Sequence, residues 1–275
     1  MRLAISNIAW EVTEDQDVAH LLHRYKVDAI DIAPGKYFPD PAKVARAEIQ
    51  RVKEWWAERG MAMTGMQALL FGTTGLNLFG PAAVQEAMLA HLVAVCRIGA
   101  ELGAVRLVFG SPRNRDRTGL TDEQADTIAT AFFRQLGDIA ARHGVVICLE
   151  PNPPVYGCNF MTTTMETAGI VRQVAHPAIR LQLDTGAMAI NEEYPKEVIA
   201  RHRDIVGHIH ASEPNLVTLG DGSARHADVA VALKADLPDR VVSIEMLAAK
   251  TEPHLIAIER ALQVATRYYR VETEK

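Results

Sequence analysis

GVVICLE (residues 144–150) is a short apolar run that begins at a glycine and ends in a carboxylate. Runs of this length, rich in Val, Ile and Leu and bounded by polar residues, are typical of parallel strands buried on both faces. Seven similar runs occur along the chain, at residues 3–9, 27–33, 61–67, 104–110, 179–184, 204–210 and 240–245. The pattern therefore predicts eight buried strands.

Amphipathic stretches alternate with these runs, and we expect them to be helices. Asp40-Pro41 is expected to begin the second helix, as an N-cap followed by a first-turn proline. The predicted helices cover residues 13–25, 41–59, 81–102, 121–143, 162–174, 195–203, a stretch after His226, and 251–269. Eight repeated βα units predict a single α/β domain over residues 1–275, folded as a (β/α)8 TIM barrel with its active site at the C-terminal rim of the strands.

An open doubly wound sheet is the competing fold. It would more often carry a glycine-rich phosphate loop after the first strand, whereas this chain has SNIAW (6–10) there. We therefore favour the closed barrel and expect no nucleotide cofactor.

Composition excludes several classes of protein. The hydrophobic content of 48% is too high for a disordered chain, and the net charge of −5 argues against a general nucleic-acid partner. The three cysteines are odd in number, which suggests reduced thiols in a cytoplasmic protein. The N-terminal residues do not resemble a signal peptide and we expect no membrane span.

The last four predicted strands all finish near a potential metal ligand: Glu150, Asp184, His210 and Glu245. A lone strand-end carboxylate often caps the next helix, but four such residues at equivalent strand ends favour a shared site. Three converging carboxylates repel one another unless a cation or protons intervene. Three carboxylates and one imidazole suit one divalent ion, with Mn²⁺ preferred over Mg²⁺ or Co²⁺, better than a thiolate-rich structural zinc site.

These strand ends carry a family resemblance. LEPN (149–152), LDTG (183–186), HIHASEPN (208–215) and SIEM (243–246) resemble the fifth to eighth strand ends of the xylose isomerase-like barrels, the sugar phosphate isomerases/epimerases. That superfamily includes ketose 3-epimerases, hydroxypyruvate isomerase and inosose dehydratase. The resemblance implies that Glu150 and Glu245 both bind the metal and act as acid and base, and that Asp184 and His210 complete the site. It also implies a possible homodimer.

The expected chemistry is proton transfer on a sugar or keto-sugar. A divalent cation that ligates a hydroxyl and an adjacent carbonyl stabilises an enediolate, and two carboxylates on opposite sides can remove and return a proton. We therefore predict a metal-dependent isomerase or epimerase with a small sugar or polyol derivative as its substrate. A lyase that dehydrates a keto-polyol is the alternative, because it would use the same residues.

The sequence departs from the ketose 3-epimerase pattern at several positions. Ala187 replaces a histidine, Tyr156 replaces a glutamate, and Leu216 and Val217 occupy the region of an expected arginine. These changes argue against a free-ketohexose 3-epimerase. A DNA-repair nuclease of the endonuclease IV type is less favoured still, because Gln67, Gly110-Ser111 and Ala187 stand where that site needs histidines.

Further residues are predicted to contact substrate. Arg113 and Arg115 are expected in a rim loop, where they could bind an anionic group or be simply solvated. Glu213 could orient His210, contact a sugar hydroxyl or stabilise its loop, and His226 could be a rim residue or a helix start. The full predicted contact set is Asn7, Gln67, Arg113, Arg115, Tyr156, Glu213 and His226. His208 is expected to be a hydrogen-bonded core histidine.

Overall fold

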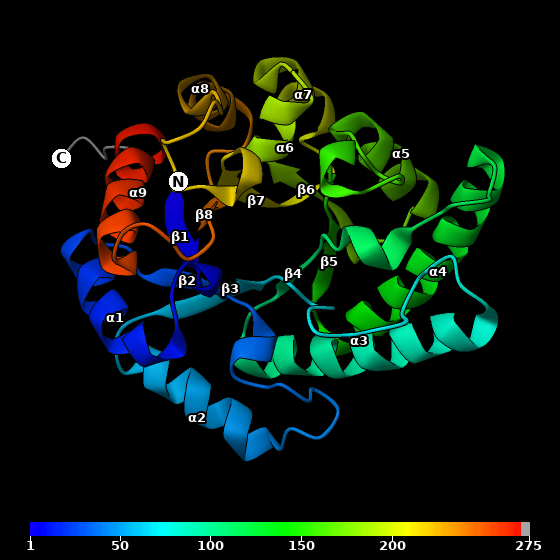
Figure 1. Ribbon diagram of the computed structural model, residues 1–275, viewed down its shortest axis with the longest axis horizontal. Coiled ribbons are helices and arrows are strands. Elements are labelled where there is room, and N and C mark those ends of the chain that lie inside the picture. Colours follow the sequence, from blue (N-terminus) through cyan, green and yellow to red (C-terminus); the bar gives the residue numbers. More distant parts are fainter. Residues whose placement is uncertain (271–275) are drawn as a thin grey trace.

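Eight parallel strands close into a barrel in the order in which they occur along the chain (Figure 1). This computed structural model describes residues 1–270, so the last five residues of the predicted domain lie outside the described residues. The strands are β1 (Arg2–Ser6), β2 (Ala29–Ile32), β3 (Ala62–Met66), β4 (Arg106–Phe109), β5 (Val146–Leu149), β6 (Ile179–Asp184), β7 (Val206–Ser212) and β8 (Val241–Glu245). The prediction of a (β/α)8 barrel is confirmed.

Helices surround the ring of strands (Figure 1). They are α1 (Asp15–Arg24), α2 (Arg46–Ala57), α3 (Ala82–Leu102), α4 (Asp122–His143), α5 (Thr164–Val174), α6 (Thr185–Ile190), α7 (Pro195–His202), α8 (His226–Asp236) and α9 (His254–Tyr269). The glycine at the end of α4 has a φ of 68°, a left-handed conformation that suits a residue without a Cβ atom.

Two helix predictions need correction. The second helix begins at Arg46, not at Pro41, because the Ala45 N–H donates to Glu48 Oε2 at 2.8 Å and starts the helix there. The short helix α6 was not predicted, because it follows β6 directly and is only six residues long.

By its length and composition alone, α3 could cross a membrane. In the folded chain, 39% of its apolar 18-residue stretch is buried. In the barrel it contacts α2 and α4 on either side and β3 and β4 beneath it. Its buried residues include Met88, Leu92 and Val95. Packing against the barrel therefore accounts for part of its apolar character.

The packing between barrel and helices is apolar, whereas the barrel interior is partly polar. Side chains alternate along a strand, so residues of β7 such as His208 and His210 point to the same side. Asp184 of β6 lies opposite His210 in the strand register, and Glu245 of β8 lies opposite Ser212. This register brings polar side chains from neighbouring strands to one end of the barrel.

Candidate active site

The structure brings Glu150, Asp184, His210 and Glu245 together at the C-terminal ends of β5 to β8. Each offers a potential ligand atom, and these atoms all lie within 4.8 Å of one another. All four residues are buried, none more than 7% exposed. Residues from four different strands are therefore arranged as one group.

The potential ligand atoms of this group lie close together without forming hydrogen bonds to satisfy one another. His210 Nδ1 lies 3.2 Å from Glu150 Oε1 and 3.1 Å from Glu245 Oε2. Despite these short distances, His210 Nδ1 and Glu150 Oε1 have no partner in hydrogen-bond geometry. Buried polar atoms without partners are costly, and a divalent cation would satisfy both. The residues present therefore fit such an ion.

Asp184 is held in place by both of its carboxylate oxygens. Oδ1 accepts a hydrogen bond from the Ala187 N–H at 2.6 Å, which makes Asp184 the N-cap of α6. Oδ2 accepts one from the Ser212 hydroxyl at 2.7 Å. Asp184 thus caps a helix and also belongs to the set Glu150, Asp184, His210 and Glu245, called the ligand group below.

The two glutamates are held by side-chain amides. Gln67 donates to Glu245 Oε1 at 2.6 Å, and Asn152 donates to Glu150 Oε2 at 3.3 Å. A Cβ atom on Gly110 would lie 1.9 Å from Glu150 Oε2. Glycine at position 110 is therefore what makes room for the Glu150 carboxylate.

The charges within this group shift the pKa values of its members. Burial and the charges of Glu150 and Glu245 raise the pKa of Asp184 well above its ordinary value. Burial alone would lower the pKa of His210, but the two facing glutamates outweigh it and raise that pKa well above the ordinary value. Burial alone would raise the pKa of Glu245, yet the His210 imidazole outweighs it and lowers that pKa. Acidic groups outnumber the imidazole, so the group favours protons or a cation.

A cavity of about 830 Å³ opens above the group. Glu150, Asp184 and Glu245 are among its lining residues, and its wall includes Leu69, Leu70, Phe71, Leu216 and Leu247. This size falls within the range of pockets that hold small molecules.

Three of the predicted contact residues line the cavity. Gln67 holds Glu245, as described above. Tyr156 accepts a hydrogen bond from the Asn215 N–H at 2.7 Å through its hydroxyl, whose own proton stays available to donate. Burial and the nearby carboxylates raise the pKa of Tyr156, so the phenol stays protonated.

Glu213, the third, uses its carboxylate to stabilise a loop. Its oxygens accept hydrogen bonds from the N–H groups of Gly220 and Ala224, both at 2.9 Å. His226 is 5% exposed, with Nε2 2.9 Å from Glu213 Oε1 and Nδ1 2.6 Å from the Tyr269 hydroxyl. The prediction of His226 as a rim residue is thus corrected: it starts α8 and supports the loop from within.

Three other predicted contacts lie away from the cavity. Arg115 is fully buried and donates from Nη1 to the backbone oxygen of Glu150 at 2.8 Å, so it supports a strand end and does not reach an anion in a rim loop. Arg113 is exposed but does not line the cavity. Asn7 is buried and accepts a hydrogen bond from the Ala33 N–H at 2.7 Å, which ties the ends of β1 and β2 together.

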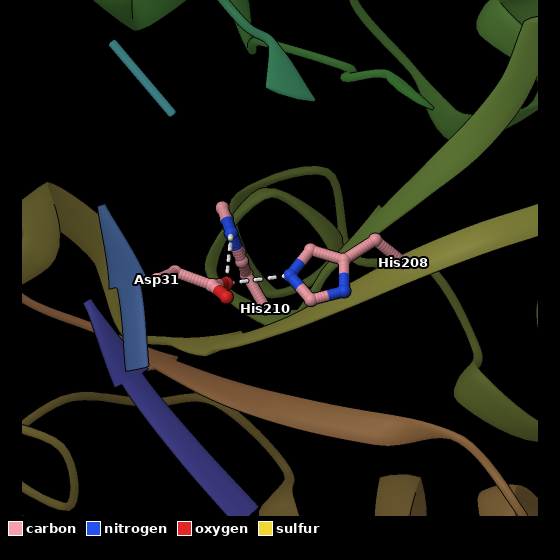
Figure 2. A group of neighbouring side chains, drawn as sticks. All are labelled: Asp31, His208 and His210. Carbon is pink, nitrogen blue, oxygen red and sulfur yellow. Dashed lines mark hydrogen bonds and ion pairs between the residues drawn. The ribbon is translucent and has the colours of Figure 1, made fainter. Parts of the chain in front are cut away.

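Asp31 of β2 lies beside the ligand group, although the sequence pattern did not identify it as a candidate site residue. Its Oδ2 lies 2.6 Å from His208 Nε2 and 4.0 Å from His210 Nε2 (Figure 2). Burial would raise the pKa of Asp31, but the two histidines outweigh it and lower that pKa below its ordinary value. The available signal was an acidic residue inside an otherwise apolar strand, because a buried carboxylate needs a partner. His208, predicted as a hydrogen-bonded core histidine, lies here with Asp31 as its partner.

Comparison with curated proteins identifies two partial relatives. The chain is 32% identical to L-ribulose 3-epimerase of Methylomonas sp. (strain DH-1) over 106 residues, which cover 38% of this chain and 37% of that protein. It is 29% identical to D-psicose 3-epimerase of Enterocloster bolteae over 120 residues, which cover 43% of this chain and 40% of that protein. Each match thus spans well under half of the relative's length.

Solved structures match over nearly the whole chain. D-psicose 3-epimerase from Clostridium cellulolyticum H10, solved with D-tagatose, superposes with a TM-score of 0.82 at 19% identity, covering 98% of this chain and all of that one (100%). The IOLI protein, solved with a zinc atom, superposes with a TM-score of 0.77 at 17% identity, covering 98% and 100%. At such identities the likeness establishes the fold and not the activity.

The family comparison covers most of the chain. Residues 19–266 match the family described as the xylose isomerase-like TIM barrel. This match includes all four residues of the ligand group and all strands but β1. The chain belongs to the xylose isomerase-like TIM barrel family.

Proposed function

We propose that this protein is a divalent-metal-dependent epimerase or isomerase that acts on a sugar or keto-sugar. The observation that carries the proposal is the group Glu150, Asp184, His210 and Glu245, whose ligand atoms lie within 4.8 Å of one another beside a cavity of about 830 Å³. The partial relatives named L-ribulose 3-epimerase and D-psicose 3-epimerase support the same class of reaction. They favour it over the dehydrating lyase and the endonuclease.

The same four residues would hold the metal. Three carboxylates and one imidazole form a donor set suited to Mn²⁺, Mg²⁺ or Co²⁺, and we propose Mn²⁺. When bound, the ion would polarise the substrate carbonyl and stabilise the negative charge of an enediolate.

Glu150 and Glu245 are proposed to move the proton. They come from β5 and β8, which are separated by β6 and β7 in the barrel, so the two carboxylates approach the cavity from different sides. One removes a proton from the substrate carbon and the other returns a proton to the opposite face, which inverts that carbon. Gln67 and Asn152 orient the two carboxylates for this transfer.

The polarity of the cavity wall indicates the class of substrate. Ala187, Tyr156 and Leu216 line the cavity at or near positions where ketose 3-epimerases are expected to carry charged or imidazole side chains. The wall is therefore less polar than a free ketohexose would favour, and we propose a sugar or keto-sugar derivative as the substrate, with the Tyr156 phenol as a hydrogen-bond donor.

We also propose that the protein acts in the cytoplasm on this small molecule, without a nucleic-acid partner, and as a homodimer. Cys96, Cys148 and Cys158 are all free and buried, as suits a reducing compartment.

Solvent exchange tests the proposed function. The protein with Mn²⁺ is incubated in D₂O with a panel of sugars, keto-sugars and their glycosides, and deuterium incorporation is measured by NMR. We expect exchange at one substrate carbon, lost in Glu150→Gln and Glu245→Gln but kept in Glu58→Gln, whose side chain is 75% exposed on the outer surface. Undiminished exchange in either of the first two variants would exclude the two-base scheme.

A further inference from the structure

Asp31 lies inside the barrel, beside the ligand group. It is 1% exposed, and its neighbours in β2 are the buried apolar residues Ala29, Ile30 and Ile32. A carboxylate in such surroundings is costly unless other groups pair with it. Its partners therefore indicate its role.

The Asp31 carboxylate is held in a fixed orientation. His208 Nε2 lies 2.6 Å from Oδ2, and because a carboxylate accepts, this nitrogen is the donor. The Thr64 hydroxyl donates to Oδ1 at 2.8 Å. A Cβ atom on Gly65 would lie 2.8 Å from the same Oδ1, so glycine leaves the space that the carboxylate occupies. Oδ2 also lies 4.0 Å from His210 Nε2.

The two ring nitrogens of His210 face different carboxylates. Nδ1 faces Glu150 and Glu245 at 3.2 and 3.1 Å. Nε2 faces Asp31 Oδ2 at 4.0 Å and has no hydrogen-bond partner of its own (Figure 2). An imidazole that ligates a metal through one nitrogen carries its proton on the other.

We propose that Asp31 is a positioning residue for His210. The negative charge of its carboxylate, 4.0 Å from His210 Nε2, favours the tautomer with the proton on Nε2 and leaves the Nδ1 lone pair directed at the proposed metal. His208 and Thr64 hold the carboxylate in place. This inference rests on the proposed metal site and adds Asp31, a residue of β2, to the support of a ligand on β7. Outer partners of metal-bound histidines typically change metal affinity by roughly 10- to 100-fold.

A second metal ion among Asp31, His208 and His210 is the competing interpretation, because their nitrogen and oxygen atoms also lie within 4.8 Å of one another. The 2.6 Å separation between His208 Nε2 and Asp31 Oδ2 is a hydrogen-bond length. The positioning role therefore predicts one bound ion per chain, whereas a second site predicts two.

Titration of the full chain with Mn²⁺ alone tests the proposal, with free Mn²⁺ followed by electron paramagnetic resonance. We expect one ion per wild-type chain, a dissociation constant raised roughly 10- to 100-fold in Asp31→Asn, and partial recovery in Asp31→Glu, which restores a carboxylate. Asp28→Asn is the matched control, because it makes the same change at a residue of 63% exposure just before β2 and should leave the constant unchanged.

A spectrum of the wild-type protein keeps the test independent of how the variants fold. In the Zn²⁺-loaded protein labelled with ¹⁵N-histidine, long-range ¹H–¹⁵N spectra should show His210 protonated at Nε2 and unprotonated at Nδ1. A proton on Nδ1, two ions per chain, or an Asp31→Asn constant equal to that of wild type overturns the positioning role while leaving the proposed function in place. A wild-type chain that binds no Mn²⁺ overturns both.

Discussion

Gly110 lies so close to Glu150 that a Cβ atom at position 110 would be 1.9 Å from Glu150 Oε2. Gly110→Ala should therefore displace this carboxylate, and a misplacement of about 1 Å can cost on the order of 100-fold in kcat/KM. Because the displaced group is the end of a flexible side chain, the free energy of unfolding should fall by only about 1–2 kcal/mol. Steady-state kinetics and denaturant unfolding measure the two effects.

Gly169→Ala is the matched control for this substitution. Gly169 lies in α5, and a Cβ atom there would meet nothing within 4 Å. Alanine should leave kcat/KM unchanged and stabilise the helix by about 0.5–1 kcal/mol. Full activity in Gly110→Ala would mean that the Glu150 carboxylate need not occupy the position described.

Metal affinity should increase with pH. The pKa of Asp184 is raised by burial and by the neighbouring carboxylates, and that of His210 is raised by Glu245 and Glu150. Both groups thus retain protons at a pH at which ordinary carboxyl and imidazole groups have lost them, and metal binding must release these protons. The dissociation constant for Mn²⁺ should fall as the pH rises between about 6 and 8.

Calorimetric titrations in two buffers of different ionisation enthalpy count the released protons. Asp184→Asn should release fewer protons than wild type, in addition to binding more weakly. A dissociation constant independent of pH over this range would contradict the charge coupling inferred for the group.

Removing the metal should lower thermal stability. An ion that binds only the folded state at 100 times its dissociation constant stabilises by about 2.7 kcal/mol, which for a chain of this size is a rise in Tm of roughly 5–10 °C. Differential scanning calorimetry with Mn²⁺ and after chelation measures the shift. Asp184→Asn should show little shift and Glu58→Gln the wild-type shift, whereas equal shifts in both would point to metal binding elsewhere.

Tyr156→Phe should reduce activity with little loss of stability. The Tyr156 hydroxyl accepts from the Asn215 N–H at 2.7 Å, and we propose that it donates to the substrate. Loss of one such hydrogen bond corresponds to about a tenfold fall in kcat/KM. Tyr194→Phe, at a residue 62% exposed, is the control. Unchanged kcat/KM and KM in Tyr156→Phe would show that the Tyr156 hydroxyl does not bind the substrate.

The strands and the grouping of the four ligand residues were predictable from the sequence, for physical reasons. Buried parallel strands need short runs of apolar residues, and the C-terminal ends of such strands meet at one rim. Glu150, Asp184 and Glu245 each end or follow a run of this kind, so their convergence required only the order of the strands.

The burial of charged residues was not predictable in the same way. Arg115 follows β4 in a segment that reads as a polar loop, yet a short turn directs its guanidinium beneath the end of β5. Charged side chains are rarely fully buried, so only the three-dimensional partners identify such a case. Asp31 is the reverse case, in which the apolar strand around it indicated burial but not which histidines it faces.

The proposed metal ligands come from one half of the barrel only. All four ligand residues lie at the ends of β5 to β8, whereas Ile8, Lys36, Leu69 and Phe71, from the segments after β1, β2 and β3, are among the residues that line the cavity. None of these four side chains supplies a ligand atom, so they can be substituted without changing the ligand group, provided that Gln67, which holds Glu245, and Asp31, which faces His210, are kept. Substrate preference can thus be altered at wall residues of both halves, at Leu69 and Phe71 as well as at Tyr156 and Leu216, while the ligand residues themselves stay unchanged.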